Sequence, residues 1–492
     1  MSLSASQWLQ GLEFQGQPGS VVVTGLTDDS RRVSPGDCFV AVAGAASDGH
    51  EYASAAVAAG AVLVLAERAL PNLVVPVLLH PQLAQLRSEL AARFYNRPSE
   101  HLRIVGITGT NGKTSVAHYT AELAERLGVA SGYMGTVGWG RPGRLEDAAL
   151  TTVDAITLQQ RLADFVQQDC ELAVLEVSSH ALVQHRLASV ATAVAVFTNL
   201  TRDHLDFHGS FENYAEAKLQ LFQRTELQTV VTNVEDPLGL QIATQMASRE
   251  GVRLVCCGSD EATAVAGASV VQWSGLRFAS TSIEGEWRTS WGTAPFSLPL
   301  LGEFAVANVA AALAVMLSEG VEFSQAVSAA NRLQGVPGRM ERFAAPGRPT
   351  VVVDYAHTPD ALAKALTALR CHSSARLLVV FGCGGDRDRG KRSQMGSVCA
   401  ELADLIYLTS DNPRSEDPEK ILDDIAVGIP AGTAVRRVAD RQRAITEAVA
   451  AADNEDLILV AGKGHEDYQE IAGQRRAFSD RMLVQSLLGE AA

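Results

Sequence analysis

A glycine-rich run ahead of a helix start constrains this 492-residue chain more than any other feature. Residues 106–115 read G-I-T-G-T-N-G-K-T-S, and they continue an apolar, strand-like segment at 102–107. Glycines let the backbone approach phosphate oxygens, and the N–H groups at a helix start attract an anion. A helix is expected from residue 113 to about 127, before Gly128. The run therefore predicts a phosphate loop of the variant form G-x-x-G-x-x-G-K-T.

Each residue type in this loop has an expected role in binding ATP. Lys113 would pair with the β- and γ-phosphates, and the Thr114 hydroxyl would bind Mg²⁺. The predicted ATP-binding residues of the loop are Gly109, Thr110, Asn111, Gly112, Lys113, Thr114 and Ser115. A strand-to-helix turn without a ligand is the alternative, but it leaves the G-K-T at the helix start unexplained. The loop predicts a nucleoside triphosphate and does not say what is phosphorylated.

Composition excludes several other classes of protein. The net charge of −15, from 41 basic and 56 acidic residues, argues against a nucleic-acid binder. The seven cysteines are scattered and show no C-x-x-C spacing, which argues against a disulfide framework or a structural zinc site. We find no signal peptide and no stretch of eighteen apolar residues. A cytoplasmic protein without a membrane span is the expectation.

The alternation of strand-like and helical segments predicts an α/β protein of three domains. Residues 1–98 form a small mixed α/β domain, with strands near 20–23, 38–42 and 61–66. Residues 99–337 form a central phosphate-loop domain with a mostly parallel sheet, including strands at 172–177 and 193–200. Residues 338–492 form a Rossmann-like, doubly wound domain. Its predicted strands are 350–354, 376–382, 405–408 and 457–460, and its predicted helices include 360–370 and 441–451.

Polar motifs follow the predicted strands of the central region. Glu176, in L-E-V-S-S-H, lies near the carboxyl end of a strand, where a carboxylate can hold Mg²⁺. Residues 199–208 read N-L-T-R-D-H-L-D-F-H and place His204 and His208 four residues apart. That spacing can indicate zinc, but no third soft ligand lies nearby, so we expect Mg²⁺. Two threonines before an aspartate, as in T-T-V-D at 151–154, are typical of a helix cap.

The C-terminal region carries its own polar loops at predicted strand ends. Residues 411–414 read D-N-P-R and follow the strand at 405–408, where open α/β sheets place ligands. Arg414 can bind a carboxylate through two parallel hydrogen bonds. A surface arginine that caps a turn is the alternative. G-K-G-H-E at 462–466 is a second such loop.

Together these motifs resemble the Mur ligase family, from about residue 20 to residue 480. The resemblance implies an ATP-dependent acid–amino-acid ligase of peptidoglycan precursor synthesis. It would join meso-diaminopimelate to the D-glutamate γ-carboxylate of UDP-N-acetylmuramoyl-L-Ala-D-Glu through an acyl phosphate. The implied partners are these small molecules and ATP, with no nucleic acid and no membrane span, and we expect a monomer.

The resemblance also implies residue roles that the residues alone do not select. The implied catalytic groups are Lys113, Glu176, His204 and Lys218. Two Mg²⁺ ions are implied, with Thr114, Glu176, His204 and a carbamylated Lys218 (N6-carboxylysine) as metal ligands. Further ATP contacts would come from Asn308, Arg339, Asp354 and His357. The UDP-muramoyl-peptide contacts would be Ser30, Thr151, Thr152, Ser178, Gln184 and Arg186. Val153 replaces a family proline and Ala305 a family asparagine.

The third amino acid is implied to bind in the C-terminal domain, through Arg387, Asp411, Asn412, Pro413, Arg414, Gly462 and Glu466. Arg414 would hold the distal carboxylate of diaminopimelate, whereas lysine offers nothing there for an arginine to bind. Three alternatives stay open. They are a lysine-adding relative, a folylpolyglutamate-type ligase, and a nucleotide-binding switch without ligase activity.

Overall fold

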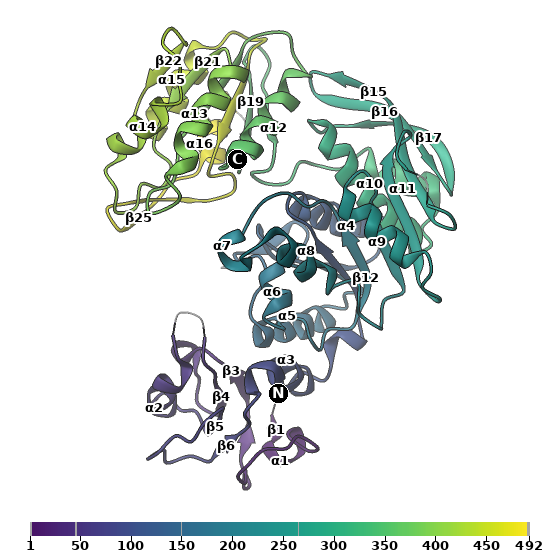
Figure 1. The fold of residues 1–492 in the computed structure, drawn as a ribbon, viewed down its shortest axis with the longest axis vertical. Helices are drawn as coiled ribbons and strands as arrows, with labels where there is room; N and C mark the ends of the chain where they lie inside the picture. Colours follow the sequence, from purple (N-terminus) through teal and green to yellow (C-terminus); the bar gives the residue numbers. More distant parts are fainter. Residues whose placement is uncertain (1, 45–46, 149, 264, 490–492) are drawn as a thin grey trace. The chain divides into compact units, whose positions relative to one another are not determined.

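The computed structural model describes residues 2–44, 47–148, 150–263 and 265–489 (Figure 1). The chain divides into two compact units. The first comprises Met1–Cys257, Ala262–Val270 and Ala314–Gly320; the second comprises Gly258–Glu261, Val271–Leu313 and Val321–Ala492. The α/β fold class is confirmed, while the predicted boundaries near residues 98 and 337 stay predictions. Among the described residues, no helix is long and apolar enough to cross a membrane.

The N-terminal part of the first unit contains a four-stranded parallel sheet in the order β3-β4-β5-β6. Its strands are β3 (Gly25–Thr27), β4 (Asp37–Ala41), β5 (Leu63–Ala66) and β6 (Val77–Leu79). Every residue of β4 and β5 is buried, as expected of apolar strands covered on both faces. Helices α2 (Ala53–Ala58) and α3 (Leu83–Phe94) accompany the sheet, and a short pair, β1 (Leu3–Ser4) with β2 (Val22–Val23), precedes it.

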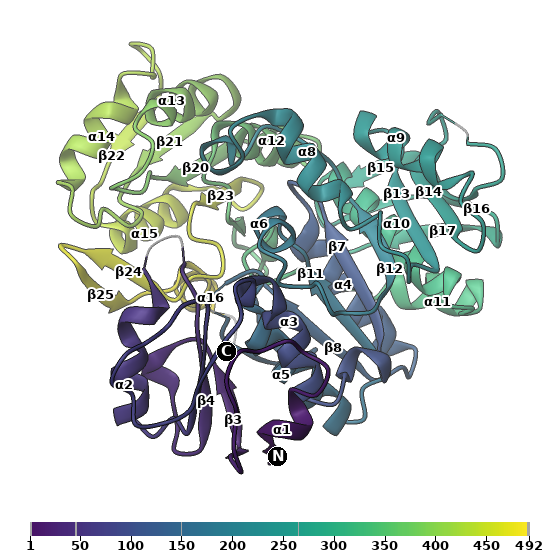
Figure 2. The same ribbon diagram turned by 60° about the horizontal axis from the view of Figure 1, so that its bottom comes forward.

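The central part of the first unit is a larger parallel sheet, in which β8, β11, β7, β12, β13 and β14 are neighbours in that order. Figure 2 shows β11, β7 and β12 of this sheet. The strands are β7 (Arg103–Thr108), β8 (Ser131–Gly135), β11 (Leu172–Glu176), β12 (Thr192–Phe197), β13 (Thr229–Asn233) and β14 (Arg253–Ser259). An antiparallel extension, β9 (Gly138–Arg141) and β10 (Arg144–Glu146), continues from β8. The helices are α4 (Lys113–Arg126), α5 (Ala155–Gln167), α6 (Ser179–Val183), α7 (Leu205–His208), α8 (Phe211–Leu219) and α9 (Pro237–Met246).

The second unit contains most of three antiparallel strands that the sequence patterns do not predict. The antiparallel strands β15 (Ser269–Ala279), β16 (Ser282–Thr289) and β17 (Gly292–Leu298) pair in sequence order. Helices α10 (Glu303–Ser318) and α11 (Phe323–Ala330) follow.

The C-terminal sheet has the order β18-β19-β23-β20-β21-β22, and its pairs are parallel except β18 with β19. The strands are β18 (Glu341–Phe343), β19 (Thr350–Asp354), β20 (Leu377–Phe381), β21 (Leu405–Leu408), β22 (Val435–Arg437) and β23 (Leu457–Ala461). A hairpin of β24 (Tyr468–Ile471) and β25 (Gln474–Ala477) follows. The helices are α12 (Pro359–Arg370), α13 (Gly390–Leu402), α14 (Pro418–Ala426), α15 (Arg441–Ala451) and α16 (Asp480–Leu488).

Alternate residues of these strands face two different cores. Val352, Val379 and Leu459 pack in a cluster with buried residues of α12, α13 and α14. Their neighbours Val351 and Val380 pack in a second cluster with residues of α15 and α16. Helices therefore cover both faces of the sheet, which confirms the predicted doubly wound fold.

Candidate active site

The predicted phosphate loop connects β7 to α4. Gly109 has φ +151°, and a Cβ there would lie 1.8 Å from Thr198 Oγ1, so a side chain does not fit. Gly112 has φ +83° and is the N-cap of α4. Lys113 Nζ donates hydrogen bonds to the carbonyl oxygens of Gly109 (3.0 Å) and Thr110 (2.8 Å). The Lys113 side chain thus folds back onto the loop and lies at the N-terminus of α4, the positive end of the helix dipole.

The start of the N-L-T-R-D-H motif, immediately after β12, supports this loop. Thr110 N donates to Asn199 O at 2.8 Å, and Asn111 N donates to Asn199 Oδ1 at 3.0 Å. Thr198 Oγ1 donates to Asn111 O at 2.6 Å. Thr201 N donates to Thr110 Oγ1 at 3.0 Å. These supporting residues could not be predicted from the sequence, because their contacts span about ninety positions of the chain.

Glu176 is buried at the end of β11, and four donors surround its carboxylate. Tyr133 Oη and Thr136 N each donate to Oε1 at 2.7 Å. Thr114 Oγ1 donates to Oε2 at 2.9 Å, and Thr136 Oγ1 lies 3.2 Å from the same oxygen. Two predicted Mg²⁺ ligands, Thr114 and Glu176, are therefore adjacent. Adjacent hydroxyl and carboxylate oxygens beside a phosphate loop fit a hard divalent cation.

The other two implied metal ligands lie around Tyr214. The imidazole of His204 is 6.1 Å from the Tyr214 ring centre, and Lys218 Nζ lies over that ring at 4.3 Å. Tyr214 Oη is hydrogen-bonded to Thr110 Oγ1 at 3.1 Å, which connects this group to the phosphate loop. Among the described residues, no three His, Cys, Asp or Glu side chains are placed to hold a metal ion together.

Lys218 differs from the expectation for a lone lysine on a helix, which is usually exposed. Its side chain is buried, and Nζ donates to the carbonyl oxygen of Gly109 at 2.7 Å. Burial, reinforced by the charge of Lys113, holds the pKa of Lys218 well below its ordinary value. Lys218, which only the resemblance singled out, is thus hydrogen-bonded to the phosphate loop.

The sequence predicts no role for His208. It is buried, and Nε2 is hydrogen-bonded to Ser179 Oγ at 2.9 Å. Asn213 Nδ2 donates to its backbone oxygen at 2.9 Å. His208 therefore ties α7 to the first residue of α6.

Four predicted muramoyl-peptide contacts form one network after β11. Thr152 Oγ1 donates to Glu176 O at 2.7 Å and accepts from Ser178 N at 3.0 Å. Arg186 donates through Nη1 to Thr152 O and through Nε to Gln184 Oε1 at 3.0 Å. Thr151 Oγ1 lies 3.0 Å from Thr136 Oγ1, so it adjoins the Glu176 group. The network holds Arg186 and Gln184 in a fixed arrangement.

Asp154 confirms the helix-cap interpretation of T-T-V-D. Its Oδ1 accepts from Ile156 N (3.0 Å) and Thr157 N (2.8 Å) at the start of α5. We expect Asp154→Ala to lower the free energy of unfolding by about 0.5–2 kcal/mol, the usual cost of losing such a cap. Urea unfolding measures this, with Gln167→Ala at the exposed end of α5 as control. Equal stability of the two variants would contradict the cap.

The segment of Ser30 lies near this network. Ser30 begins a short 3-10 helix after Asp29, and Arg32 Nη1 donates to Thr157 Oγ1 at 3.0 Å. Burial and the charge of Asp154 raise the pKa of Asp28, which is paired with Arg87 at 2.9 Å. The loop that carries Ser30 therefore faces the N-terminus of α5.

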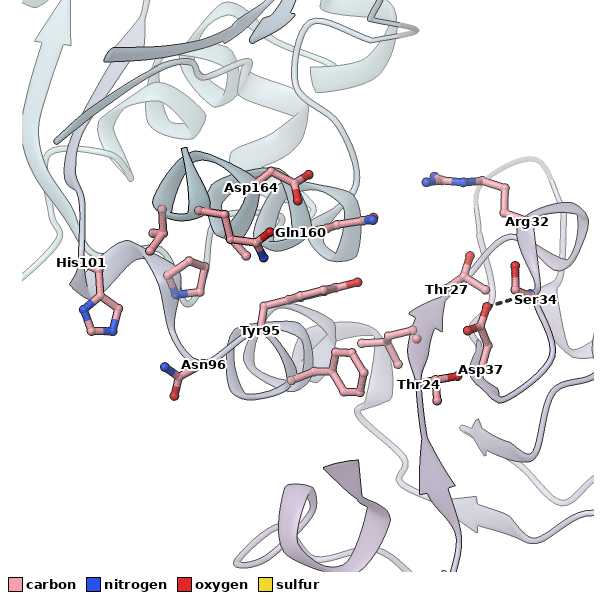
Figure 3. A pocket seen from close by; sticks show the side chains of 17 residues that line it. Thr24, Thr27, Arg32, Ser34, Asp37, Tyr95, Asn96, His101, Gln160 and Asp164 are labelled. Carbon is pink, nitrogen blue, oxygen red and sulfur yellow. Dashed lines mark hydrogen bonds between the residues drawn. The ribbon is translucent and has the colours of Figure 1, made fainter. Parts of the chain in front are cut away.

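A cavity of about 500 Å³ opens beside this loop (Figure 3). It lies between β3, the end of α3 and the Gln160–Asp164 stretch of α5, and Arg32 and Ser34 line it. Tyr95 projects into it, and burial raises the pKa of Tyr95 to about 12. Ser30 is not among its lining residues.

In the second unit, three predicted ATP contacts gather around Tyr355. The Arg339 guanidinium stacks on the Tyr355 ring at 4.5 Å, and the ring of His357 lies 4.8 Å from it. Asp354 accepts from Met340 N at 2.7 Å, which ties the loop of Arg339 to the end of β19. Burial raises the pKa of Asp354, against the opposing effect of Arg339. Asn308, the fourth, lies half-buried on α10.

The predicted amino-acid site brings two loops together after β20 and β21. Arg414 has a left-handed backbone (φ +51°), and its Nη1 donates to Gly385 O at 2.8 Å. Its Nε lies 3.8 Å from Glu470 Oε2. The 384–387 loop, which carries the exposed Arg387, is thus in contact with D-N-P-R.

A third loop, G-K-G-H-E after β23, completes this group. Asn412 Nδ2 donates to Glu466 Oε2 at 2.9 Å. A Cβ on Gly462 would lie 2.8 Å from Asp411 Oδ2, so glycine permits the close approach of the two loops. Burial raises the pKa of Asp411, whereas Arg441 and Lys463 lower it. All the predicted amino-acid contacts therefore lie on three touching loops.

Comparison with known proteins identifies related chains along nearly the whole length. Family models described as "Mur ligase family, catalytic domain", "Mur ligase middle domain" and "Mur ligase, glutamate ligase domain" match residues 22–95, 107–316 and 338–464. Two relatives named UDP-N-acetylmuramoyl-L-alanyl-D-glutamate--2,6-diaminopimelate ligase are similar. The one from Alkalilimnicola ehrlichii is 45% identical, covering 98% of this chain and 97% of its own. The one from Pseudomonas putida is 44% identical, covering 92% of each. A solved structure with the same name is 36% identical, covers 99% of both chains and has a TM-score of 0.72.

Proposed function

Because the chain belongs to the Mur ligase family, we propose that it joins meso-diaminopimelate to UDP-N-acetylmuramoyl-L-alanyl-D-glutamate. The reaction uses ATP and Mg²⁺ and contributes to peptidoglycan precursor synthesis. In this proposal residues 1–98 bind the uridine part, residues 99–337 bind ATP, and residues 338–492 bind the amino acid. The names of the two relatives support the substrate assignment.

In the first step, the γ-carboxylate of D-glutamate attacks the γ-phosphorus of ATP. The bond to the β,γ-bridging oxygen breaks, ADP leaves, and an acyl phosphate forms. Lys113 and the N–H groups at the start of α4 hold the phosphates and offset their charge. Thr114, Glu176, His204 and a carbamylated Lys218 would hold two Mg²⁺ ions, which supply further charge neutralisation. Arg186 and Gln184 orient the muramoyl peptide.

In the second step, the free amine of diaminopimelate attacks the acyl carbon. The tetrahedral intermediate expels inorganic phosphate, the amine loses a proton, and an amide bond is left. No protein nucleophile takes part, so catalysis rests on positioning and electrostatics. Arg414 binds the distal carboxylate, and Asn412 and Glu466 bind near the distal amine.

The observation that carries this proposal is that Arg414 and the hydrogen-bonded pair Asn412 and Glu466 lie on adjoining loops at the end of one sheet. Such a group offers a guanidinium for a carboxylate and a carboxylate for an ammonium. It favours a substrate with both charges at its far end over lysine, which lacks the carboxylate. It also favours a ligase over a nucleotide switch, which needs no amino-acid site.

Phosphate release measured with the muramoyl dipeptide and a panel of amino acids tests the function. We expect release only when ATP, the dipeptide and meso-diaminopimelate are all present. Release without an acceptor would indicate a nucleotide switch, and equal rates with L-lysine would indicate the lysine-adding class. A requirement for a folate in place of the dipeptide would indicate the folylpolyglutamate class.

Lys218→Ala tests the proposed carbamate. We expect kcat to fall on the order of 10²-fold, because an oxygen ligand near the phosphates is lost. A short carboxylic acid such as acetate should restore part of the activity of this variant, whereas bicarbonate should not. Steady-state rates at increasing acetate concentration measure the effect.

Lys218→Met provides the matched control, because its longer side chain leaves no room for acetate. Acetate should therefore not rescue Lys218→Met. The proposal of a carbamate is wrong if acetate raises the activity of both variants equally.

A further inference from the structure

Lys463, the second residue of G-K-G-H-E, is a lysine whose side chain has no solvent exposure. Its Nζ lies 2.9 Å from Glu466 Oε2, 3.1 Å from Asn412 Oδ1 and 4.0 Å from Asp411 Oδ1. Burying an ammonium is unfavourable unless charged and polar partners compensate for the lost water. All three partners are residues of the proposed amino-acid site. The residues that compensate for burying the Lys463 ammonium are therefore the same residues that are proposed to bind the substrate.

We propose that Lys463 is a positioning residue, which holds Glu466 and Asn412 in the arrangement that receives the distal ammonium of the amino-acid substrate. The inference rests on the proposed function and deepens it, because it assigns the recognition of one substrate group. Lys463 acts through Glu466 and Asn412 and does not touch the reacting atoms.

The hydrogen bonds around Glu466 explain how positioning works. Lys463 Nζ and Asn412 Nδ2 both donate to Oε2, each at 2.9 Å. Two donors on one oxygen fix the orientation of the carboxylate. Among the described residues, the hydrogen bonds to this carboxylate all go to Oε2, and the side chain is 20% exposed. Oε1 is thus the oxygen that an incoming ammonium can meet.

The orientation of Lys463 follows from the glycines on either side. Gly462 has φ +118° and Gly464 has φ +55°. A Cβ on Gly464 would lie 2.7 Å from Gly338 O and 2.8 Å from Tyr355 Cβ, so this residue must be small. The loop can therefore turn sharply on both sides of Lys463 and direct its side chain inward.

A second buried cation, Arg441, holds the strand ends behind Lys463. Arg441 is fully buried, pairs with Asp480 at 2.7 Å, and donates to the carbonyl oxygens of Ser410 and Ala461 at the ends of β21 and β23. Arg441 and Asp480 balance each other, so Lys463 is the cation that lies beside Glu466.

The test compares two amino acids that differ in the distal amine alone. meso-Diaminopimelate has this amine, whereas L-2-aminopimelate keeps both carboxylates and the attacking amine but lacks the distal one. For Lys463→Met, which keeps most of the length of the side chain without its charge, we expect KM for diaminopimelate to rise about 10- to 100-fold. The inhibition constant of L-2-aminopimelate, measured in competition, should change less than about threefold, and KM for ATP should not change.

Two further variants separate positioning from a structural role. In the double variant with Glu466→Gln, removal of Lys463 should add little to the loss caused by Glu466→Gln alone. Lys364→Met, at an exposed lysine paired with Asp360 on α12, should behave as wild type. If Lys463→Met does not fold, Lys463→Gln, which is uncharged and shorter than lysine, is expected to show a selective loss in the same direction.

Equal loss of affinity for both amino acids, or no loss for either, would overturn the inference. The same holds if neither Lys463→Met nor Lys463→Gln yields folded protein, because the residue would then serve the fold. Failure of the proposed function is a distinct result, since wild-type enzyme would then not ligate diaminopimelate at all.

Discussion

Lys113→Ala should lower kcat for ligation on the order of 10³-fold or more, while the fold stays intact. A cation that offsets charge on a transferring phosphoryl group contributes this much to the rate. Lys113 Nζ bonds to the carbonyl oxygens of Gly109 and Thr110. The loop itself is held from the other side by Thr198, Asn199 and Thr201, so its shape does not depend on the lysine. Single-turnover phosphate release and circular dichroism measure the two effects.

Arg126→Ala is the matched control for this prediction. Arg126 is a cation in the last turn of the same helix, where it pairs with Glu122 at 2.6 Å. It should reduce helix stability slightly and leave kcat unchanged. Activity of Lys113→Ala within a few-fold of wild type would contradict the assignment of the loop to ATP.

The phosphate loop could be predicted because all its determinants are local. Gly109, Gly112 and Lys113 lie within five consecutive positions, and their roles follow from backbone freedom and charge. The residues that support the loop could not be predicted in the same way. Thr198 and Asn199 reach it because β12 is a neighbour of β7 in the sheet. Strand order depends on packing between distant segments, which local patterns do not specify.

Lys218 shows the same limit for a single side chain. Helical periodicity treats a lysine as a solvent-facing residue, whereas α8 turns this one toward Gly109. Tyr214, four residues earlier, lies on the same side of the helix and shields the ammonium. A tyrosine four residues before a lysine can indicate that the lysine is covered by the ring. It does not indicate that the lysine contacts Gly109. Resemblance to a family selected the residue; the residue types did not.

Strands were predicted well where they are buried on both faces. β19 and β21 have the predicted bounds, since continuous apolar runs mark strands covered by helices on both sides. The antiparallel strands β15 to β17 were missed because their exposed faces carry mixed residues. β17 also contains Pro295, which argues against a central strand and is compatible with pairing to β16 on one side.

Arg414 should determine which amino acid the protein uses. Wild type is expected to prefer meso-diaminopimelate over L-lysine by roughly 10⁴-fold, because a site built for a polar group rejects an analogue that lacks it. With L-lysine bound, the Arg414 guanidinium would have no carboxylate to pair with and would lie near the lysine ammonium. In Arg414→Ala, the loss for diaminopimelate should be about 2–5 kcal/mol, as for other desolvated charge pairs. Steady-state kinetics with both amino acids measure both numbers.

Arg414→Ala measures the contribution of the guanidinium alone, because the wild type already bears the cost of the left-handed backbone at this position. Arg414 has φ +51°, which is equally unfavourable for arginine and alanine, so the substitution adds no strain of its own. Arg414→Gly would relieve that strain and separate the two contributions. KM for ATP should not change, since Arg414 contacts Gly385 and Glu470 and is assigned to the amino acid alone.

The matched control is Arg443→Ala, at an exposed arginine of α15 that pairs with Glu447. It should leave both amino-acid constants unchanged, because an exposed pair contributes little. Lysine use should rise slightly in Arg414→Ala, since the cation that repels the lysine ammonium is gone. If wild type used both amino acids equally well, or if Arg414→Ala raised KM for ATP instead, Arg414 would have no part in recognising the distal carboxylate.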